Sequence, residues 1–483
     1  MESARSMKSW RIFTRQDTRR ICNFLIILCL MLSIYALSNI KSHYCQAPYG
    51  KLQAPLKLEQ PSKVVANQLR EESRGSSAID ELFAEDEDAE ENSAAISSQK
   101  PICRDSNKRS DTCDARGDIR VQGSSSTVFV STSPQEWKIK PYARKGYHSA
   151  LRHVTEWSLK PFAQQIPNCT VAQMVPAVIF SIAGFTGNIF HDFTDVLIPL
   201  FISSHQFNGQ VQFLVADVKP WWLSRYKLIL KQMSSYEIIH VLRDGGDMIR
   251  CFPRAIIGLQ FHKEMGVDST NSPTGYSIVD FKVMLRRAYG LERADISSSV
   301  FQGSVRKPRL LIISRKRSRS FVQVKGMVEM ATSLGFEVLV DEADVNTDLS
   351  KFARLVNSAD VLLGVHGAGL TNMLFLPAGA VVIQMAPFGA PEWLQRETFG
   401  KATEDLELHY LEYRIEMEES TLMDQYPRDH PVLKDPESVQ KLGWNEFWQV
   451  YLEKQNVRPH LGKLKETFLK AMKLLPRNGN SGI

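Results

Sequence analysis

The strongest constraint on the fold is a strand, a glycine-rich loop, a short helix and a second strand in consecutive order near residue 370. Ala359 to Leu363, apolar except for Asp360, is typical of the end of a buried parallel strand. Asn372 to Leu376 then predicts a short helix that Pro377 stops, and Ala380 to Gln384 predicts the second strand. This order predicts an α/β fold with a parallel sheet.

The loop between these strands has the composition of an anion site. Backbone N–H groups at a helix N-terminus point outward, and Gly367 and Gly369 carry no side chains that would block a phosphate. His366 stands at the carboxyl end of the strand, where open α/β sheets bind ligands, and Thr371 and Asn372 complete the loop. The alternative is that the glycines only permit tight packing and a sharp turn.

Size and charge narrow the class of protein. At 483 residues and 43% hydrophobic composition, the chain is long enough for one large or two ordinary globular domains. The net charge of +6 is modest, and its sign changes along the chain. We therefore expect no nucleic-acid partner.

The N-terminal region predicts a membrane anchor. Residues 21–38 form an apolar run close to the roughly 20 residues that a helix needs to cross a bilayer. Four arginines precede the run, at positions 11, 15, 19 and 20. The positive-inside rule predicts a cytosolic tail at residues 1–20, an uncleaved signal anchor at 21–40 and a luminal C-terminal part. A cleaved signal peptide is the alternative, but no Ala-x-Ala pattern follows the run.

Residues 41–100 predict a disordered luminal stem, because they lack apolar periodicity and include an acidic block at 84–91.

Cysteine usage fits an oxidising compartment. Cys103, Cys113, Cys169 and Cys251 lie in the folded part and allow three pairings. The short polar segment from Cys103 to Cys113 has no metal-ligand spacing, so a local disulfide is the simplest interpretation, with Cys169 and Cys251 as the other pair. Asn168-Cys169-Thr170 is an N-x-[ST] sequon, which predicts one glycan on Asn168.

Strands and helices alternate through the rest of the chain, in two successive βαβ halves at residues 101–275 and 276–483. In the first half we expect a doubly wound sheet with strands at 128–130, 177–182, 211–216 and 237–242 and helices at 189–203 and 223–233. In the second we expect strands at 309–314 and 336–340 and helices at 324–334 and 349–357, before the glycine loop. Two such halves place a ligand cleft between them.

Two further motifs follow strands. Gly184 to Phe193 brings together Gly187, Asn188, His191 and Asp192 where a strand becomes a helix. Asn188 and Asp192 could instead cap the helix while His191 packs. Because adjacent helical residues do not share a face, only one of His191 and Asp192 is expected to act as a base.

The second motif is basic. Arg315, Arg317 and Arg319 follow the strand at 309–314, and arginine binds two phosphate oxygens at once. Alternation predicts that the three share a side. A solvated basic loop is the alternative.

Taken together, these motifs resemble plant family 61 glycosyltransferases. The resemblance rests on Gly184 to Phe193, Ile313 to Arg319, Gly364 to Asn372 with Phe375-Leu376-Pro377, Tyr426 to Val432 and Gly443-Trp444, and it covers residues 100 to 475. The segment near Cys103 with Gly117 to Arg120, and Pro141 to Lys145, resemble the grass-type branch that decorates xylan.

The resemblance implies a GT-B-like fold, with two Rossmann-like halves facing a central cleft. It implies a single-pass type II Golgi enzyme that transfers a pentose, arabinofuranose or xylose, from a UDP-sugar to xylan side chains with inversion, in cell-wall synthesis. Because no convincing Asp-x-Asp occurs in the folded part, we expect no essential metal or other cofactor.

Under this resemblance each motif has a role. Arg315, Arg317, His366 and the loop from Gly367 to Asn372, with Gly369 and Thr371, hold the donor diphosphate in the 276–483 half. His191 or Asp192 is the base, and Gly187 and Asn188 lie on the acceptor side, in the 101–275 half.

Two alternatives stay open: a non-catalytic scaffold of a Golgi polysaccharide-synthesis complex, and a family 61 enzyme acting on protein N-glycans. A complex with other Golgi glycosyltransferases is also compatible with the resemblance.

Overall fold

The computed structural model describes residues 102–105, 109–131, 135–162, 166–245, 248–297, 306–342 and 347–476, which belong to one compact unit. The predicted tail, anchor and stem at residues 1–100 lie outside these ranges. Within the described ranges, every helix is too short or too polar to cross a membrane.

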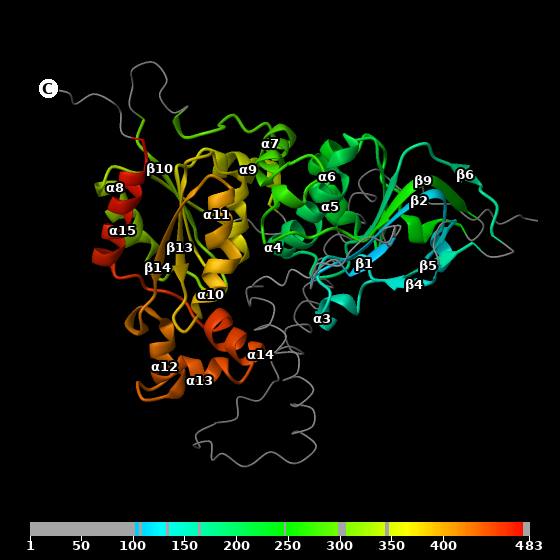
Figure 1. Ribbon diagram of the computed structural model, residues 1–483. Coiled ribbons are helices and arrows are strands. Elements are labelled where there is room, and N and C mark those ends of the chain that lie inside the picture. Colours follow the sequence, from blue (N-terminus) through cyan, green and yellow to red (C-terminus); the bar gives the residue numbers. More distant parts are fainter. Residues whose placement is uncertain are drawn as a thin grey trace, which may run out of the picture. The chain divides into compact units, whose positions relative to one another are not determined.

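The C-terminal sheet is fully parallel and carries the glycine loop (Figure 1). Its strand order is β11-β10-β12-β13-β14. The strands are β10 (Arg309–Ile313), β11 (Glu337–Asp341), β12 (Val361–Val365), β13 (Val381–Ala386) and β14 (His409–Arg414). The four strands predicted in this half are confirmed, and β14 joins them.

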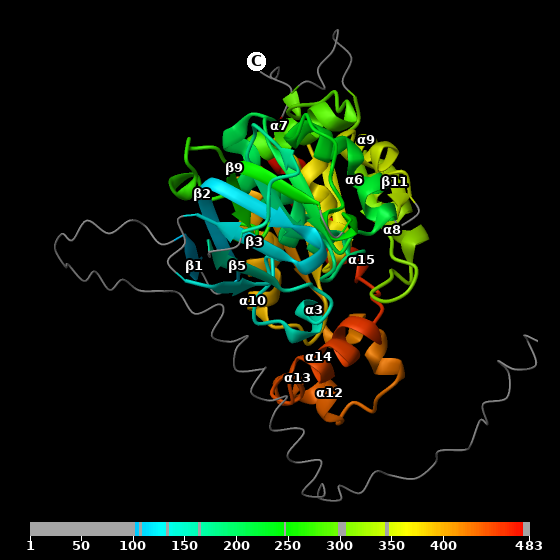
Figure 2. The same ribbon diagram turned by 90° about the vertical axis from the view of Figure 1, so that its right-hand side faces the viewer.

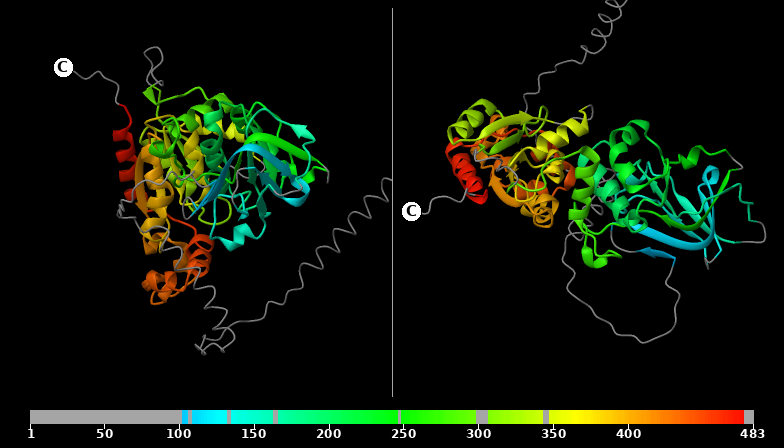
Figure 3. Two further views of the ribbon diagram at one scale, coloured as in Figure 1. Left: turned by 45° about the vertical axis from the view of Figure 1, so that its right-hand side comes forward. Right: turned by 90° about the horizontal axis from the view of Figure 1, so that it is seen from above.

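Helices cover both faces of this sheet (Figures 1 and 3). One face holds α8 (Val324–Ser333) and α15 (Leu461–Leu474), and the other holds α9 (Leu349–Asn357) and α11 (Lys401–Asp405). Side chains of a strand alternate between the faces, so Leu310 and Ile312 of β10 pack with α8 and α15, whereas Leu311 and Ile313 pack on the other side. Short helices that lie below this sheet in Figure 1 surround a separate apolar cluster. They are α10 (Glu392–Gln395), α12 (Pro431–Lys434), α13 (Pro436–Gln440) and α14 (Trp444–Phe447).

The N-terminal sheet is mixed, with the path β4-β5-β3-β2-β9-β7-β8, to which β1 and β6 add at β2 and β9. Its strands are β1 (Cys103–Asp105), β2 (Asp111–Gln122), β3 (Thr127–Val130), β4 (Trp137–Ile139), β5 (Trp157–Pro161), β6 (Val171–Ala172), β7 (Ala177–Ser181), β8 (Gln212–Ala216) and β9 (Ile249–Ile257).

The expectation of a doubly wound sheet in this half is wrong. The long strand β2 pairs antiparallel with both β3 and β9, as Figure 2 shows. Charged residues alternate with apolar ones along β2, which is the pattern of a half-buried strand and differs from the continuous apolar runs by which the other strands were predicted.

The strand predicted at residues 237–242 is also wrong. Only Leu214 and Ile239 form a bridge there, and the chain then enters a 3-10 turn at Val241–Arg243. The Gln212 side chain donates to the Glu237 carbonyl at 2.6 Å, so that carbonyl is bonded to a side chain rather than to a neighbouring strand. β7 pairs with β8 on one side and with β9 on the other.

One hydrophobic core joins the two sheets. The continuous helix formed by α4 (Ile189–His191), a π-helical turn (Asp192–Leu197) and α5 (Ile198–Ser204) supplies Phe193, which is fully buried. The Phe193 ring centroid lies 6.3 Å from that of Phe281 on α7 (Ile278–Tyr289) and 6.0 Å from that of Phe375 beyond the glycine loop. The domain boundary at residues 275 and 276 stays a prediction.

The structure pairs Cys103 with Cys113 and Cys169 with Cys251, across sequence separations of 10 and 82 residues. Loop-closure entropy predicts that the longer loop contributes about 4.5 kcal/mol to the free energy of unfolding and the shorter one about 2.7 kcal/mol. Replacing both cysteines of a pair by serine should therefore cost more stability at Cys169 and Cys251. Urea unfolding of the two double variants checks this ranking, and equal losses would contradict it.

Candidate functional site

The glycine loop brings two arginines against its backbone. Gly367 has φ of +142°, and a Cβ at this position would lie 2.5 Å from Nη1 of Arg315 and 2.8 Å from Nη1 of Arg319. Nη1 of Arg319 also donates to the carbonyl oxygen of His366 at 2.8 Å. We call Arg315, Arg319, His366 and Gly367 the arginine–glycine cluster. Only glycine fits at its centre, because any side chain would displace a guanidinium group.

The cluster concentrates positive charge. Burial and the nearby charge of Arg315 lower the pKa of Arg319 to about 9. Burial likewise lowers the pKa of Arg315, against weaker opposing effects of Glu342 and Glu453. Among the described residues, the Nε atoms of both arginines are buried without a hydrogen-bond partner. An anion bound here would supply both the missing acceptors and the compensating charge.

Arg317 lies away from this cluster. Arg317 and Lys316 are exposed, so the expected alternation of Arg315, Arg317 and Arg319 on one side is not seen. Alternation requires an extended backbone. Residues 316–319 form a bend, in which Arg319 has a left-handed φ of +55° and lies with its guanidinium group against Gly367.

Further polar groups surround the loop. The helix that follows it, η8 (Ala368–Phe375), carries Thr371 and Asn372. In the described part of the chain, Oγ1 of Thr371, Oδ1 of Asn372 and Oε1 of Gln384 are buried without partners, while Nδ2 of Asn372 donates to the Gly369 carbonyl at 2.8 Å. Buried polar groups normally have partners, so these three unpaired oxygens make the loop a candidate ligand site.

His366 is a buried, neutral member of the cluster. Burial, with the charges of Arg319 and Arg315, lowers its pKa to about 3. Its Nδ1 atom lies 3.2 Å from Nε2 of Gln384 on β13. A neutral imidazole beside two arginines is suited to hydrogen bonding rather than to carrying charge.

The second part of the site begins at Asn188. Its Oδ1 atom accepts a hydrogen bond from the Phe190 N–H at 3.1 Å, so Asn188 caps α4. One turn later, Nδ1 of His191 lies 2.9 Å from Oδ2 of Asp195. These two residues are four apart on the helix and therefore share a face.

Asp195 is a buried carboxylate with strong partners. It accepts from Nε and Nη2 of Arg144 at 2.8 and 2.7 Å and from the Tyr142 hydroxyl at 2.9 Å. Burial alone would raise its pKa, but the charges of Arg144 and His191 and their hydrogen bonds hold the pKa of Asp195 well below its usual range. Because an ionised carboxylate only accepts, Nδ1 of His191 must carry the hydrogen, and Nε2 is then the basic atom.

The side chain of Asp192 has other partners than those of His191 and Asp195. It is 2% exposed and accepts from the Gly187 N–H at 3.1 Å, from Nε1 of Trp222 at 2.8 Å and from the Tyr226 hydroxyl at 2.9 Å. Burial raises its pKa, opposed by these hydrogen bonds. Its carboxylate therefore ties the Gly187 turn to α6 (Pro220–Met233). The π-helical turn that starts here is a feature frequent at functional sites.

The two parts are neighbours in space. α4 contacts η8 directly. The ring centroid of Phe190 lies 5.3 Å from that of His191 and 5.6 Å from that of Phe399, which in turn lies 5.6 Å from His366. Two phenylalanine rings thus connect the imidazole of His191 to the arginine–glycine cluster.

A cavity of about 920 Å³ adjoins the Asp195 network. Its lining draws on both parts of the chain, including Arg109, Glu264 and Tyr410. Oε1 of Glu264 lies 3.7 Å from Nη2 of Arg144 and pairs with Arg109. A continuous set of charged groups therefore runs from the cavity wall to His191.

Sequence reasoning missed four residues of this site: Tyr142, Arg144, Asp195 and Gln384. Only Asp195 has a local signal, its spacing of four from His191 on a predicted helix. Arg144 reaches it from 51 residues away, which no local pattern reveals.

Comparison with known proteins identifies the family. The model for glycosyltransferase 61 matches residues 189–383, a range that includes His191, Asp195 and the arginine–glycine cluster. Beta-1,2-xylosyltransferase XYXT1 of Oryza sativa subsp. japonica is 38% identical, over 77% of this chain and 84% of that protein. The chain belongs to glycosyltransferase family 61.

Two other relatives agree with this assignment. Alpha-1,3-arabinosyltransferase XAT3 of Oryza sativa subsp. japonica is 45% identical, and xylan glycosyltransferase MUCI21 of Arabidopsis thaliana is 37% identical. These matches cover 77% and 76% of this chain. The chain spans 65% of the length of XAT3 and 78% of that of MUCI21. A solved structure of the glycosyltransferase TibC from enterotoxigenic E. coli has a TM-score of 0.24 and 14% identity, over 58% of this chain and 76% of that one, which is a weak similarity.

The neutral state of His366 predicts a pH-dependent stability. Its pKa of about 3 lies below the ordinary value of 6.5, so the unfolded chain takes up the proton first as the pH falls. This stabilisation is present above pH 6.5 and is lost toward pH 3, by about 2 kcal/mol between pH 7 and pH 5. Between these two pH values, the free energy of unfolding measured with urea should fall less for His366→Asn than for the wild type. Identical decreases in the two proteins would contradict the interpretation that His366 is neutral in the folded chain.

Proposed function

We propose that this protein is an inverting glycosyltransferase that transfers a pentose, arabinofuranose or xylose, from a UDP-sugar to xylan. The names of XAT3, XYXT1 and MUCI21 support this substrate class. The observation that carries the proposal is the contact between α4 and η8, which places a histidine–aspartate pair beside a buried cationic cluster.

In this proposal the arginine–glycine cluster holds the donor diphosphate. Arg315 and Arg319 supply charge and N–H groups, and Gly367 leaves room for their two guanidinium groups to lie against the loop backbone. Such a cradle stabilises the negative charge that develops as the UDP leaves. Thr371, Asn372 and Gln384 offer the remaining polar contacts. Arg319 takes the position that the sequence assigned to Arg317.

His191 is the base in this mechanism. Its Nε2 atom removes the proton of the acceptor hydroxyl while that oxygen forms the bond to the anomeric carbon. The bond from the anomeric carbon to the diphosphate oxygen breaks at the same time, and UDP departs with its electron pair. Asp195 stabilises the resulting imidazolium ion and keeps the ring oriented. Gly187 and Asn188 stand on the acceptor side of this histidine.

The proposal extends to the domain architecture and to the subcellular location. We propose a GT-B-like arrangement in which donor and acceptor meet between the two halves, 101–275 and 276–483. The apolar run at residues 21–38 supports a type II anchor in the Golgi membrane with a luminal catalytic part, and the two disulfides fit an oxidising compartment. A complex with other Golgi glycosyltransferases is compatible with this location.

The assignment of His191 as the base predicts different effects for three variants. His191→Ala should lower the turnover number by 10²- to 10⁴-fold while the affinity for UDP stays within twofold, because only proton transfer is lost. Asp195→Asn should also lower turnover, since the orienting charge is gone. Asp192→Asn should mainly lower the melting temperature, because its three donors lose a charged acceptor. Single-turnover kinetics with xylo-oligosaccharide and a panel of UDP-pentoses measure the first two effects.

A turnover unchanged by His191→Ala would contradict this assignment. A large loss of turnover in Asp192→Asn with an unchanged melting temperature would move the role of base to Asp192.

The cradle assignment has a matched control on the same loop. Arg315→Ala or Arg319→Ala should weaken UDP binding at least 100-fold, because each removes a charge-assisted bond to phosphate. Arg317→Ala removes an exposed charge and should change the dissociation constant less than threefold. Isothermal titration calorimetry with UDP, at matched melting temperatures, measures all three. Equal losses in the three variants would contradict the cradle.

A further inference from the structure

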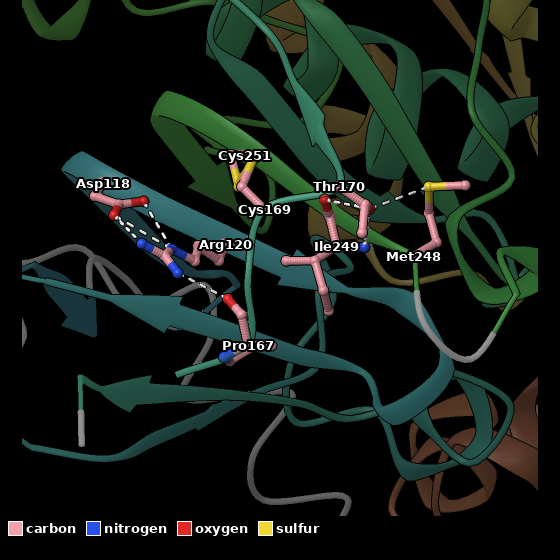
Figure 4. Close-up of a disulfide and its surroundings, with 8 residues drawn as sticks. All are labelled: Asp118, Arg120, Pro167, Cys169, Thr170, Met248, Ile249 and Cys251. Atoms are coloured by element: carbon pink, nitrogen blue, oxygen red, sulfur yellow. Dashed lines mark hydrogen bonds and ion pairs between the residues drawn. A yellow bond between two sulfur atoms is a disulfide. The ribbon is translucent and has the colours of Figure 1, made fainter. Parts of the chain in front are cut away.

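The sequon at Asn168 lies on the surface beside a disulfide. Asn168, Cys169 and Thr170 are all exposed. Figure 4 shows Cys169 bonded to Cys251 of β9, with Thr170 next to Ile249 at the start of the same strand. The acceptor asparagine is therefore accessible, but its two sequon partners are bound to a neighbouring strand.

Thr170 uses its hydroxyl within the fold. Oγ1 of Thr170 donates to the Ile249 carbonyl at 2.9 Å and accepts from the Ile249 N–H at 2.7 Å (Figure 4). The backbone N–H of Thr170 also donates to the Ile249 carbonyl, at 3.0 Å. The hydroxyl at the third position is part of what defines an N-glycan acceptor, so in the folded chain this group is already occupied.

The flanking residues are held as well. Nη1 of Arg120 donates to the Pro167 carbonyl at 2.8 Å, and Asp118 binds the same guanidinium group at 2.7 Å (Figure 4). After the sequon, the Gln173 N–H donates to the Cys251 carbonyl at 2.8 Å. With the disulfide in the middle, this segment cannot change its backbone conformation to enter the active site of another enzyme without breaking several bonds.

We propose that Asn168 accepts an N-linked glycan only before the disulfide between Cys169 and Cys251 closes. The amide nitrogen of Asn168 attacks the anomeric carbon of a lipid-diphosphate-linked oligosaccharide. The carbon–oxygen bond to the diphosphate breaks, the lipid diphosphate leaves and the amide proton passes to the membrane transferase. Disulfide closure is the competing step: the two thiols lose two protons, and their two electrons pass to a protein disulfide of the lumen.

Chain synthesis provides the interval for the first reaction. Cys251 follows Cys169 by 82 residues. At 5 to 20 residues per second, it is made roughly 4 to 16 s later. During this interval Asn168 and Thr170 have no disulfide and no β9 strand to bind. Because Asn168 is exposed in the final fold, an attached glycan is compatible with later closure.

The other disulfide offers a matched control. Cys103 and Cys113 are 10 residues apart and lie in β1 and β2, so their closure leaves the sequon untouched. Cys251→Ser and Cys113→Ser each leave one cysteine of a disulfide without its partner. A general effect of a free thiol would therefore affect both variants, whereas closure of the sequon disulfide is lost only in Cys251→Ser.

The experiment expresses the full chain in cells with a secretory pathway, labels it for a few minutes and measures the glycosylated fraction of the Asn168 peptide by mass spectrometry. Asn168→Gln provides the unglycosylated reference. We expect partial occupancy in the wild type, at least a twofold higher glycosylated fraction in Cys251→Ser, and wild-type occupancy in Cys113→Ser. A short pulse of dithiothreitol on cells that express the wild type should raise the glycosylated fraction of Asn168 as much as Cys251→Ser does. This treatment does not depend on the folding of any variant.

The proposal would be overturned by equal occupancy in wild-type, Cys251→Ser and dithiothreitol-treated samples. It would also be overturned by the absence of a glycan on Asn168 in every sample. Neither result bears on UDP binding or turnover, so its failure is distinguishable from a failure of the proposed function.

Discussion

The buried ion pair of Arg144 and Asp195 is the interaction on which the site depends. A fully buried carboxylate is costly unless it is paired, and here a forked guanidinium group and the Tyr142 hydroxyl compensate it. Because Asp195 stays ionised, it holds the Nδ1 hydrogen of His191 and leaves Nε2 as the basic atom. Removing Arg144 would leave a buried charge unpaired, which is more damaging than the loss of one hydrogen bond.

The shared hydrophobic core connects this pair to the arginine–glycine cluster. Phe193 lies two residues after His191 and packs against Phe375, which ends η8. The helix that carries His191 and the loop that carries the arginine–glycine cluster are therefore parts of one packed unit. A cluster of two partly desolvated arginines is itself unfavourable without an anion. The energy of the shared core allows this unfavourable arrangement to persist until a ligand compensates it.

Predictions from the sequence succeeded where the signal was local. The strands of the second sheet are apolar runs between turn residues, and all four predicted ones are present. They failed where the signal depended on distant partners. The strand β2 alternates charged and apolar residues, and its pairing with β9 joins residues more than 100 positions apart. Alternation placed Arg317 on the same side as Arg315 and Arg319, but it assumed an extended chain that the loop does not adopt.

By itself, the sequence determined the parallel sheet with its glycine loop, the order of motifs typical of family 61, and the presence of one histidine and one aspartate as candidate bases. Only the tertiary structure shows how different their surroundings are. Trp222 and Tyr226, from a helix about 30 residues later, bind the carboxylate of Asp192, while Arg144 and Asp195 orient His191. Adjacent residues on a helix point in different directions, and which direction leads to the core is set by elements far away in the chain.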